Sequence, residues 1–143
     1  MRPVNGPCTL TLIMSETQYK GDVALSKAIS TFTILKYIVS LPITDSAPYD
    51  LIIDDGFGLY RVQCKYSSSE KYVDLRRIHS NAKGYVIKRY KNSFDWLYVF
   101  HSNGKEYLIK ENLDHKTYFR LNDKYLLDDG TSGLVTGFEH QTP

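Results

Sequence analysis

The first long pattern in the sequence is that of a helix. Apolar residues recur every three or four positions between residues 19 and about 36, which places them on one face of a helix. That face consists of Leu25, Ala28, Ile29, Phe32 and Leu35. Asp22 stands near the beginning, where the first helical turn favours negative charge. We therefore predict a helix over residues 19–36 with one buried face and with Asp22 in its first turn.

Shorter runs of β-branched and aromatic residues follow and predict strands. Three of them lie at residues 37–43, 49–54 and 59–66, with Asp55-Gly56-Phe57-Gly58 as a turn between the second and the third. Later strands are predicted at residues 72–78, 85–90, 95–101 and 105–110, the last two joined as a hairpin across Ser102-Asn103-Gly104. Beyond Leu113 the pattern weakens, and turns are expected at 128–130 and 131–133. One helix followed by a series of strands predicts a mixed α+β fold.

Length and composition indicate one globular domain. The chain has 143 residues, of which 42% are hydrophobic and 24% charged, which is enough to bury a core. No apolar run approaches the roughly 20 residues of a membrane helix, so we expect a soluble intracellular protein without a membrane partner. Residues 1–13 contain two Pro and one Gly and precede Met14, a second possible start. We expect them to be peripheral and residues 14–143 to form the domain.

Positive charge gathers in one segment. Residues 60–91 hold nine basic residues and two acidic ones, whereas the rest of the chain is acidic overall. Such asymmetry in a small domain favours a polyanion bound by one face, with nucleic acid as the first candidate. The alternative is that these cations form the ordinary solvated surface of strands. The chain also has 12 Tyr, which fits either a binding surface or a tyrosine-rich sheet.

Familiar catalytic and metal-binding motifs are missing from the sequence. It has no phosphate-binding loop, no Gly-x-Ser-x-Gly elbow and no Cys-x-x-Cys pair. Its two cysteines and four histidines show no spacing suited to a disulfide framework or to zinc. Candidate chemistry must therefore come from residues that the fold brings together.

Three polar residues would converge if the second and third predicted strands pair across the 55–58 turn. Asp50 begins one strand, and Gln63 and Lys65 share a face of the other because side chains alternate along a strand. This set suits metal-assisted phosphodiester hydrolysis, in which Asp50 binds Mg²⁺ and Lys65 orients the nucleophile or stabilises the pentavalent charge. Each residue also has an ordinary alternative, as the start of a strand, a satisfied polar side chain or a surface cation.

Pro48-Tyr49-Asp50 followed by Gln63-Cys64-Lys65 resembles the signature of the PD-(D/E)XK nucleases, an Asp on one strand and acid-x-Lys on the next. The wider match, residues 19–111, looks closest to the cyanobacterial intron-encoded homing endonucleases of this class and is also similar to archaeal Holliday-junction resolvases. The resemblance implies a restriction-endonuclease-like core, a mixed sheet flanked by helices with a basic β-ribbon and a C-terminal extension. It also implies a bacterial, cytoplasmic enzyme that uses Mg²⁺, with Ca²⁺ or Mn²⁺ able to substitute in binding.

The resemblance assigns the metal to Asp50, Gln63 and the backbone carbonyl of Cys64. Two positions depart from the family pattern. Gln63 stands where most relatives carry Asp or Glu, so the charge is lost while an oxygen ligand remains. Leu25 stands at the position of a family Glu on the helix, although it also fits the apolar face described above. Our hypothesis is that the metal site is weak and that the chain binds its duplex but cuts it slowly or not at all.

The expected DNA-binding region lies at about residues 66–91. A two-stranded ribbon fits the major groove, where Arg pairs with guanine edges and Lys meets phosphates. The candidate contacts are Arg76, Arg77, Lys83, Tyr85, Lys88, Arg89 and Lys91. A second interpretation, compatible with the first, is that the apolar residues of this region pack inward beneath the cations: Val73, Leu75, Val86 and Ile87.

A subunit of this length is too small to span a long target and cut both strands, so we expect a symmetric oligomer and a pseudo-palindromic site. The resemblance implies a homotetramer. The leading hypothesis is a site-specific, Mg²⁺-dependent endonuclease of the homing type that acts on double-stranded DNA. A Holliday-junction resolvase and a non-catalytic DNA-binding module remain as alternatives.

Overall fold

A capping box fixes the start of the long helix. The computed structural model describes residues 15–81 and 83–128, and its helix α2 spans Glu16–Ile34. The Ser15 hydroxyl accepts a hydrogen bond from the Gln18 backbone N–H, and the Gln18 side chain accepts one from the Ser15 N–H. The helix therefore begins before the predicted position. Asp22 lies in its second turn, which corrects the first-turn prediction.

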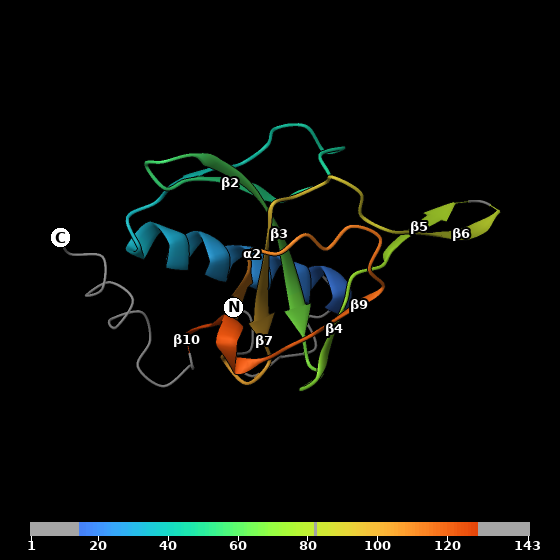
Figure 1. Ribbon diagram of the computed structural model, residues 1–143. Helices are drawn as coiled ribbons and strands as arrows, with labels where there is room; N and C mark the ends of the chain where they lie inside the picture. The colour runs from blue at the N-terminus through green and yellow to red at the C-terminus, as the bar shows by residue number, and fades with distance from the viewer. Residues whose placement is uncertain (1–14, 82, 129–143) are drawn as a thin grey trace, which may run out of the picture.

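Six strands form a mixed sheet against which α2 packs (Figure 1). In spatial order they are β1 (Ile38–Ser40), β2 (Leu51–Asp54), β3 (Leu59–Ser67), β7 (Trp96–His101), β8 (Glu106–Ile109) and β10 (Leu126–Asp128). β3 and β7 run parallel, and the other neighbours are antiparallel. The predicted α+β class is confirmed, and β1, β2, β3, β7 and β8 form at their predicted places.

The central strands alternate between two apolar clusters, one on each face of the sheet. Cys64 and Tyr98 face α2, while Leu97 and Val99 face the other side. On that side β4 (Tyr72–Asp74) pairs with β9 (Tyr118–Arg120). Within the described residues the second face is thus covered by strands and loops, and α2 covers the first.

A two-stranded ribbon projects from the body of the protein (Figure 1). It consists of β5 (Arg77–Asn81) and β6 (Gly84–Lys88), which pair antiparallel. The strand predicted over 72–78 is therefore divided, because β4 pairs with β9 and does not continue into the ribbon. Val73 and Leu75 are buried as expected, but Ile87 is 48% exposed, so its predicted inward packing is wrong.

The C-terminal part contains more regular structure than its pattern indicates. β9, the 3₁₀ helix η1 (Asp123–Tyr125) and β10 all follow Leu113. Asp128 ends β10, and the rest of the turn predicted at 128–130 lies outside the described residues. Residues 1–13 and the turns predicted at 129–133 lie outside the described residues, as do the side chains of Tyr85 and Val86. In the part that is described, no helix has the length and apolar character needed to cross a bilayer.

Candidate active site

A tight turn brings the two strands of the candidate site into register. β2 pairs with β3 so that Leu51 lies opposite Val62. The Asp55 carboxylate closes the turn over residues 55–58 by accepting two of its backbone N–H groups, at 2.8 and 2.9 Å. Asp50, directly before β2, is held beside β3 because its N–H donates to the Val62 carbonyl at 2.9 Å.

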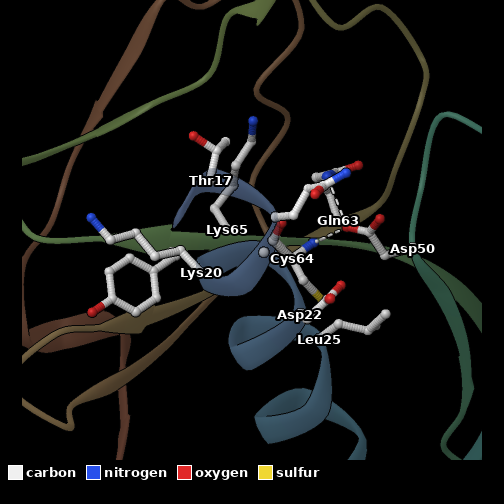
Figure 2. A pocket seen from close by; sticks show the side chains of 11 residues that line it. Thr17, Lys20, Asp22, Leu25, Asp50, Gln63, Cys64 and Lys65 are labelled. Carbon is white, nitrogen blue, oxygen red and sulfur yellow. Dashed lines mark hydrogen bonds between the residues drawn. The ribbon is translucent and has the colours of Figure 1, made fainter. Parts of the chain in front are cut away.

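The Asp50 side chain contacts β3 directly. Its Oδ2 accepts hydrogen bonds from the Gln63 Nε2 and from the Cys64 backbone N–H, both at 2.8 Å. Lys65 lines the same pocket, and Figure 2 shows these residues around it. The structure thus brings together the three polar residues that the sequence singled out.

The lining of this pocket comes from both α2 and β3. Its volume is ≈ 750 Å³, which is in the range of pockets that bind small ligands. Asp22 and Leu25 contribute from the helix (Figure 2). Leu25 also packs against the helix-side core. It therefore lies at the border between core and pocket, where a longer acidic side chain would reach the pocket.

Burial and charge act in opposite directions on the two ionisable groups at the centre. Burial raises the pKa of Asp50, and the Cys64 N–H and the Lys65 ammonium partly offset that rise. Burial lowers the pKa of Lys65, while Asp74 and Asp50 raise it and Arg77 lowers it further. A carboxylate and an ammonium are thus kept partly desolvated and close enough to affect each other.

The Gln63 amide bridges two oxygen atoms that suit a cation. Nε2 donates to Asp50 Oδ2 at 2.8 Å and to the Cys64 carbonyl at 3.3 Å. The Asp50 carboxylate and the Cys64 carbonyl are both hydrogen-bond acceptors, so the amide nitrogen occupies the position between them that a cation would take. With the amide turned, its oxygen would join the other two in an all-oxygen set, which fits Mg²⁺ or Ca²⁺ better than a soft metal.

In the described part of the chain, two carboxylates line this pocket, those of Asp22 and Asp50. Among the described residues, no three His, Cys, Asp or Glu side chains converge as a metal site. A cation would therefore rely on Asp50, on main-chain and amide oxygen, and on Asp22 from the helix if its side chain approached. This matches the expectation of a weak metal site, which stays a prediction.

The lysines proposed to contact DNA lie at the surface, on the ribbon and at its base. Lys83, Lys88 and Lys91 are exposed. Arg89 is also exposed, and its Nε donates to the Thr117 hydroxyl at 3.1 Å. These positions suit phosphate contacts, which require reach more than a fixed geometry.

The two neighbouring arginines have different surroundings. Arg76 lies between β4 and β5, off the ribbon, where it pairs with the Asp74 carboxylate through Nη2 at 2.7 Å and Nε at 3.0 Å. Arg77 begins β5, and its guanidinium carbon lies 5.2 Å from the ring centre of Tyr90. Arg77 is thus at the base of the ribbon, on the side of the pocket.

Several residues near the site were not singled out from the sequence. Thr17 and Lys20 line the pocket from the first turns of α2. Tyr90 is 4% exposed, and the Lys65 Nζ lies 5.5 Å from its ring centre. No local pattern indicates that contact, because it depends on the chain returning to β3 after the ribbon.

Comparison with known proteins gives a family match and a structural relative. Residues 15–128 match the family model described as PD-(D/E)XK endonuclease. Among solved structures, the chain is similar to a bacterial homing endonuclease, I-Ssp6803I, with 28% identity, a TM-score of 0.62, and coverage of 76% of this chain and 79% of that chain. No curated protein matches the sequence. The resemblance drawn from the sequence motifs is confirmed.

Proposed function

Because the chain belongs to the PD-(D/E)XK endonuclease family, we propose that it is a site-specific endonuclease of the homing type that hydrolyses double-stranded DNA with Mg²⁺. The observation that supports this most is the meeting of Asp50, Gln63 and Lys65 in one pocket. The base of a projecting, basic ribbon lies next to that pocket, since Arg77 and Lys65 contact the same tyrosine ring.

The cation would be held by the Asp50 carboxylate, the Cys64 carbonyl and the Gln63 amide oxygen. When bound, it supplies Lewis-acid polarisation of the scissile phosphate and a water of lowered pKa. Gln63 must turn its amide for this, because Nε2 now donates to the two other oxygen atoms. Ca²⁺ or Mn²⁺ would use the same oxygen set for binding.

Lys65 would act on the phosphate. Its ammonium is partly desolvated, and a charge in such surroundings interacts more strongly with a phosphate oxygen than it would in water. It would therefore orient the attacking water or stabilise the negative charge on the oxygens of the pentavalent transition state. Asp50 keeps this cation directed to the pocket, because the two groups attract each other.

The ribbon would bind the duplex, with Lys83, Lys88 and Lys91 at phosphates and Arg77 and Arg89 nearer to base edges. Cutting both antiparallel strands requires two copies of the pocket related by symmetry. The proposal therefore includes a symmetric oligomer, a homotetramer, and a long pseudo-palindromic target.

A library of linear duplexes incubated with Mg²⁺ tests this function, with bound molecules and new ends both sequenced. Slow cleavage at one pseudo-palindromic sequence is expected, because the proposed metal site is weak. Asp50→Ala and Lys65→Ala should abolish the new ends while duplex affinity in Ca²⁺ persists, and Lys116→Ala, an exposed lysine outside pocket and ribbon, should cleave normally. Cutting of four-way junctions of any sequence, with linear duplex left intact, would show a resolvase instead.

A non-catalytic DNA-binding module is the second candidate function. The observation that favours it is the apolar Leu25 in the pocket, at the position where the family resemblance implies a Glu. Sequence-specific duplex binding with no new ends in either Mg²⁺ or Mn²⁺ would support the module over the endonuclease.

A further inference from the structure

The ring of Tyr90 lies where the ribbon, the core and the pocket meet. Arg77 opens β5 and Tyr90 follows β6 by two residues, so both ends of the ribbon arrive at this ring. The Arg77 guanidinium carbon is 5.2 Å and the Lys65 Nζ is 5.5 Å from the ring centre. Two cations, one at the base of the ribbon and one at the pocket, therefore share one aromatic side chain.

The ring itself is held in place. Tyr90 is 4% exposed within the second apolar cluster, and Phe94 packs edge-on against it with ring centres 4.9 Å apart. The Tyr90 carbonyl accepts the His115 backbone N–H at 2.8 Å, which fixes the main chain as well. A ring with these neighbours offers a rigid surface to the flexible side chains that contact it.

A lysine needs such a surface to act at a fixed point. Its four-carbon stem loses much rotamer freedom when the ammonium is confined. The negative face of an aromatic ring attracts a cation most where water is displaced, and the Lys65 ammonium is partly desolvated. The ring thus reduces the set of positions that the ammonium occupies beside Asp50.

The shared Tyr90 ring also links the position of the Lys65 ammonium to DNA binding by Arg77. Arg77 and Lys65 repel each other across it, because both are positively charged. A DNA phosphate that paired with Arg77 would move the guanidinium away from the Tyr90 ring. Only Lys65 would then contact the face of that ring. Engagement of the ribbon would thereby strengthen the hold on the ammonium.

We propose that Tyr90 is a positioning residue, which holds the Lys65 ammonium at the pocket and couples it through Arg77 to duplex binding by the ribbon. The inference deepens the proposed function and rests on it. Tyr90 touches neither the phosphate nor the cation in this scheme and acts only through Lys65.

Three variants separate positioning from general packing. Tyr90→Phe keeps the ring and both cation contacts, whereas Tyr90→Leu keeps an apolar side chain and removes the ring. Phe119→Leu, in the same apolar cluster, is the control for a lost aromatic side chain with no cation assigned to it. Thermal melts of all three set the temperature at which each is folded.

The first measurement does not need cleavage. In protein with carbon-13-labelled lysine, the Lys65 side-chain signal should be shifted by the ring in the wild type, in Tyr90→Phe and in Phe119→Leu. The shift should be lost in Tyr90→Leu. Saturating uncleaved duplex in Ca²⁺ should move the signal in the wild type, and Arg77→Ser should suppress that movement.

The second measurement is single-turnover cleavage with Mg²⁺ beside duplex affinity in Ca²⁺. Tyr90→Leu should lower the rate by about tenfold or more with affinity nearly unchanged, while Tyr90→Phe restores it. An unchanged Lys65 signal in Tyr90→Leu, or equal rate losses in Tyr90→Leu and Phe119→Leu, overturns the inference. If the wild type binds without cutting while the signal depends on the ring and on Arg77, the positioning is supported and the proposed endonuclease function is overturned.

Discussion

Leu25→Glu should convert a weak metal site into a strong one. Leu25 lines the pocket that holds Asp50 and Gln63, and its side chain also packs on the edge of the helix-side core. A Glu can keep its stem on that edge and extend its carboxylate into the pocket. The pocket would then present carboxylates at two family positions, and a hard cation favours anionic oxygen.

Without a cation the substitution should destabilise the fold moderately. Leu25 is partly buried, so its replacement forfeits about 1 kcal/mol of apolar burial. If the new carboxylate lies roughly 7 Å from that of Asp50, the two repel by about 2 kcal/mol at an effective dielectric constant of about 20. A loss of about 3 kcal/mol in the free energy of unfolding lowers Tm by roughly 10 °C.

A saturating divalent cation should restore most of this loss, because a ligand at a hundred times its Kd stabilises the folded state by about 2.7 kcal/mol. Thermal melts in EDTA and in Ca²⁺ should therefore show a large rise in Tm for Leu25→Glu and a small rise for the wild type. In Mg²⁺, single-turnover cleavage should increase by about a hundredfold or more, with similar duplex affinity.

Ile29→Glu is the matched control. Ile29 lies one turn further along α2 and packs partly buried on the same core, and it is not among the residues that line the pocket. Both variants should melt earlier in EDTA, but Ca²⁺ should rescue only Leu25→Glu. If Leu25→Glu unfolds the chain, responds to Ca²⁺ no more than Ile29→Glu, or leaves cleavage unchanged, then position 25 is a core position and the family Glu does not carry over to it.

Three further predictions concern charge and burial. Burial raises the pKa of Asp50, so the protonated carboxyl stabilises the fold fully below the ordinary pKa of Asp, and this stabilisation is lost as pH rises through the raised pKa. Asp50→Asn should therefore raise Tm in EDTA near pH 7 and leave Tm nearly unchanged near pH 3. Lys88→Ser and Lys91→Ser should each reduce the slope of log affinity against log salt by about one, measured by anisotropy with a duplex, and an affinity that does not vary with salt would contradict the basic ribbon. Glu106 is 1% exposed and accepts the hydroxyl hydrogen bonds of Thr31 and Tyr98, so Glu106→Ala should cost about 3 to 5 kcal/mol in urea unfolding, and a cost below about 1 kcal/mol would show that these bonds add little.

Local signals predicted the elements whose partners are close in sequence. Helix α2 repeats its apolar spacing over several turns, and the Asp55-Gly56 and Asn103-Gly104 turns bring adjacent strands together. The apolar stripe predicts a start of α2 that is too late, because the capping residues precede the stripe. The local pattern does not predict the division of the 72–78 strand, because β4 pairs with β9, far along the chain. Ile87 directly follows Val86, and adjacent side chains on a strand point to opposite faces, so the two cannot both pack inward on one face, and Ile87 is the exposed one of the described positions.

The centre of the candidate site was predictable for a related reason. Asp50, Gln63 and Lys65 belong to two strands joined by a recognisable turn, so their meeting follows from strand pairing. Tyr90 reaches Lys65 only after the chain has left the sheet, formed the ribbon and returned. Contacts of that kind depend on the paths of loops, which local spacing does not encode.

β3 contributes side chains to the core and main-chain groups to the pocket, so the residues that decide the chemistry of the site differ from those that hold the fold. The Cys64 side chain is buried in the helix-side core, while its N–H binds Asp50 and its carbonyl accepts from Gln63. The Cys64 N–H and carbonyl belong to the main chain of β3, so we expect uncharged residues at positions 25 and 63 to weaken cation binding while they leave the sheet and the ribbon intact. An endonuclease and a DNA-binding module can share this scaffold and differ in two side chains, so cation-dependent melting and cleavage, more than duplex affinity, distinguish them.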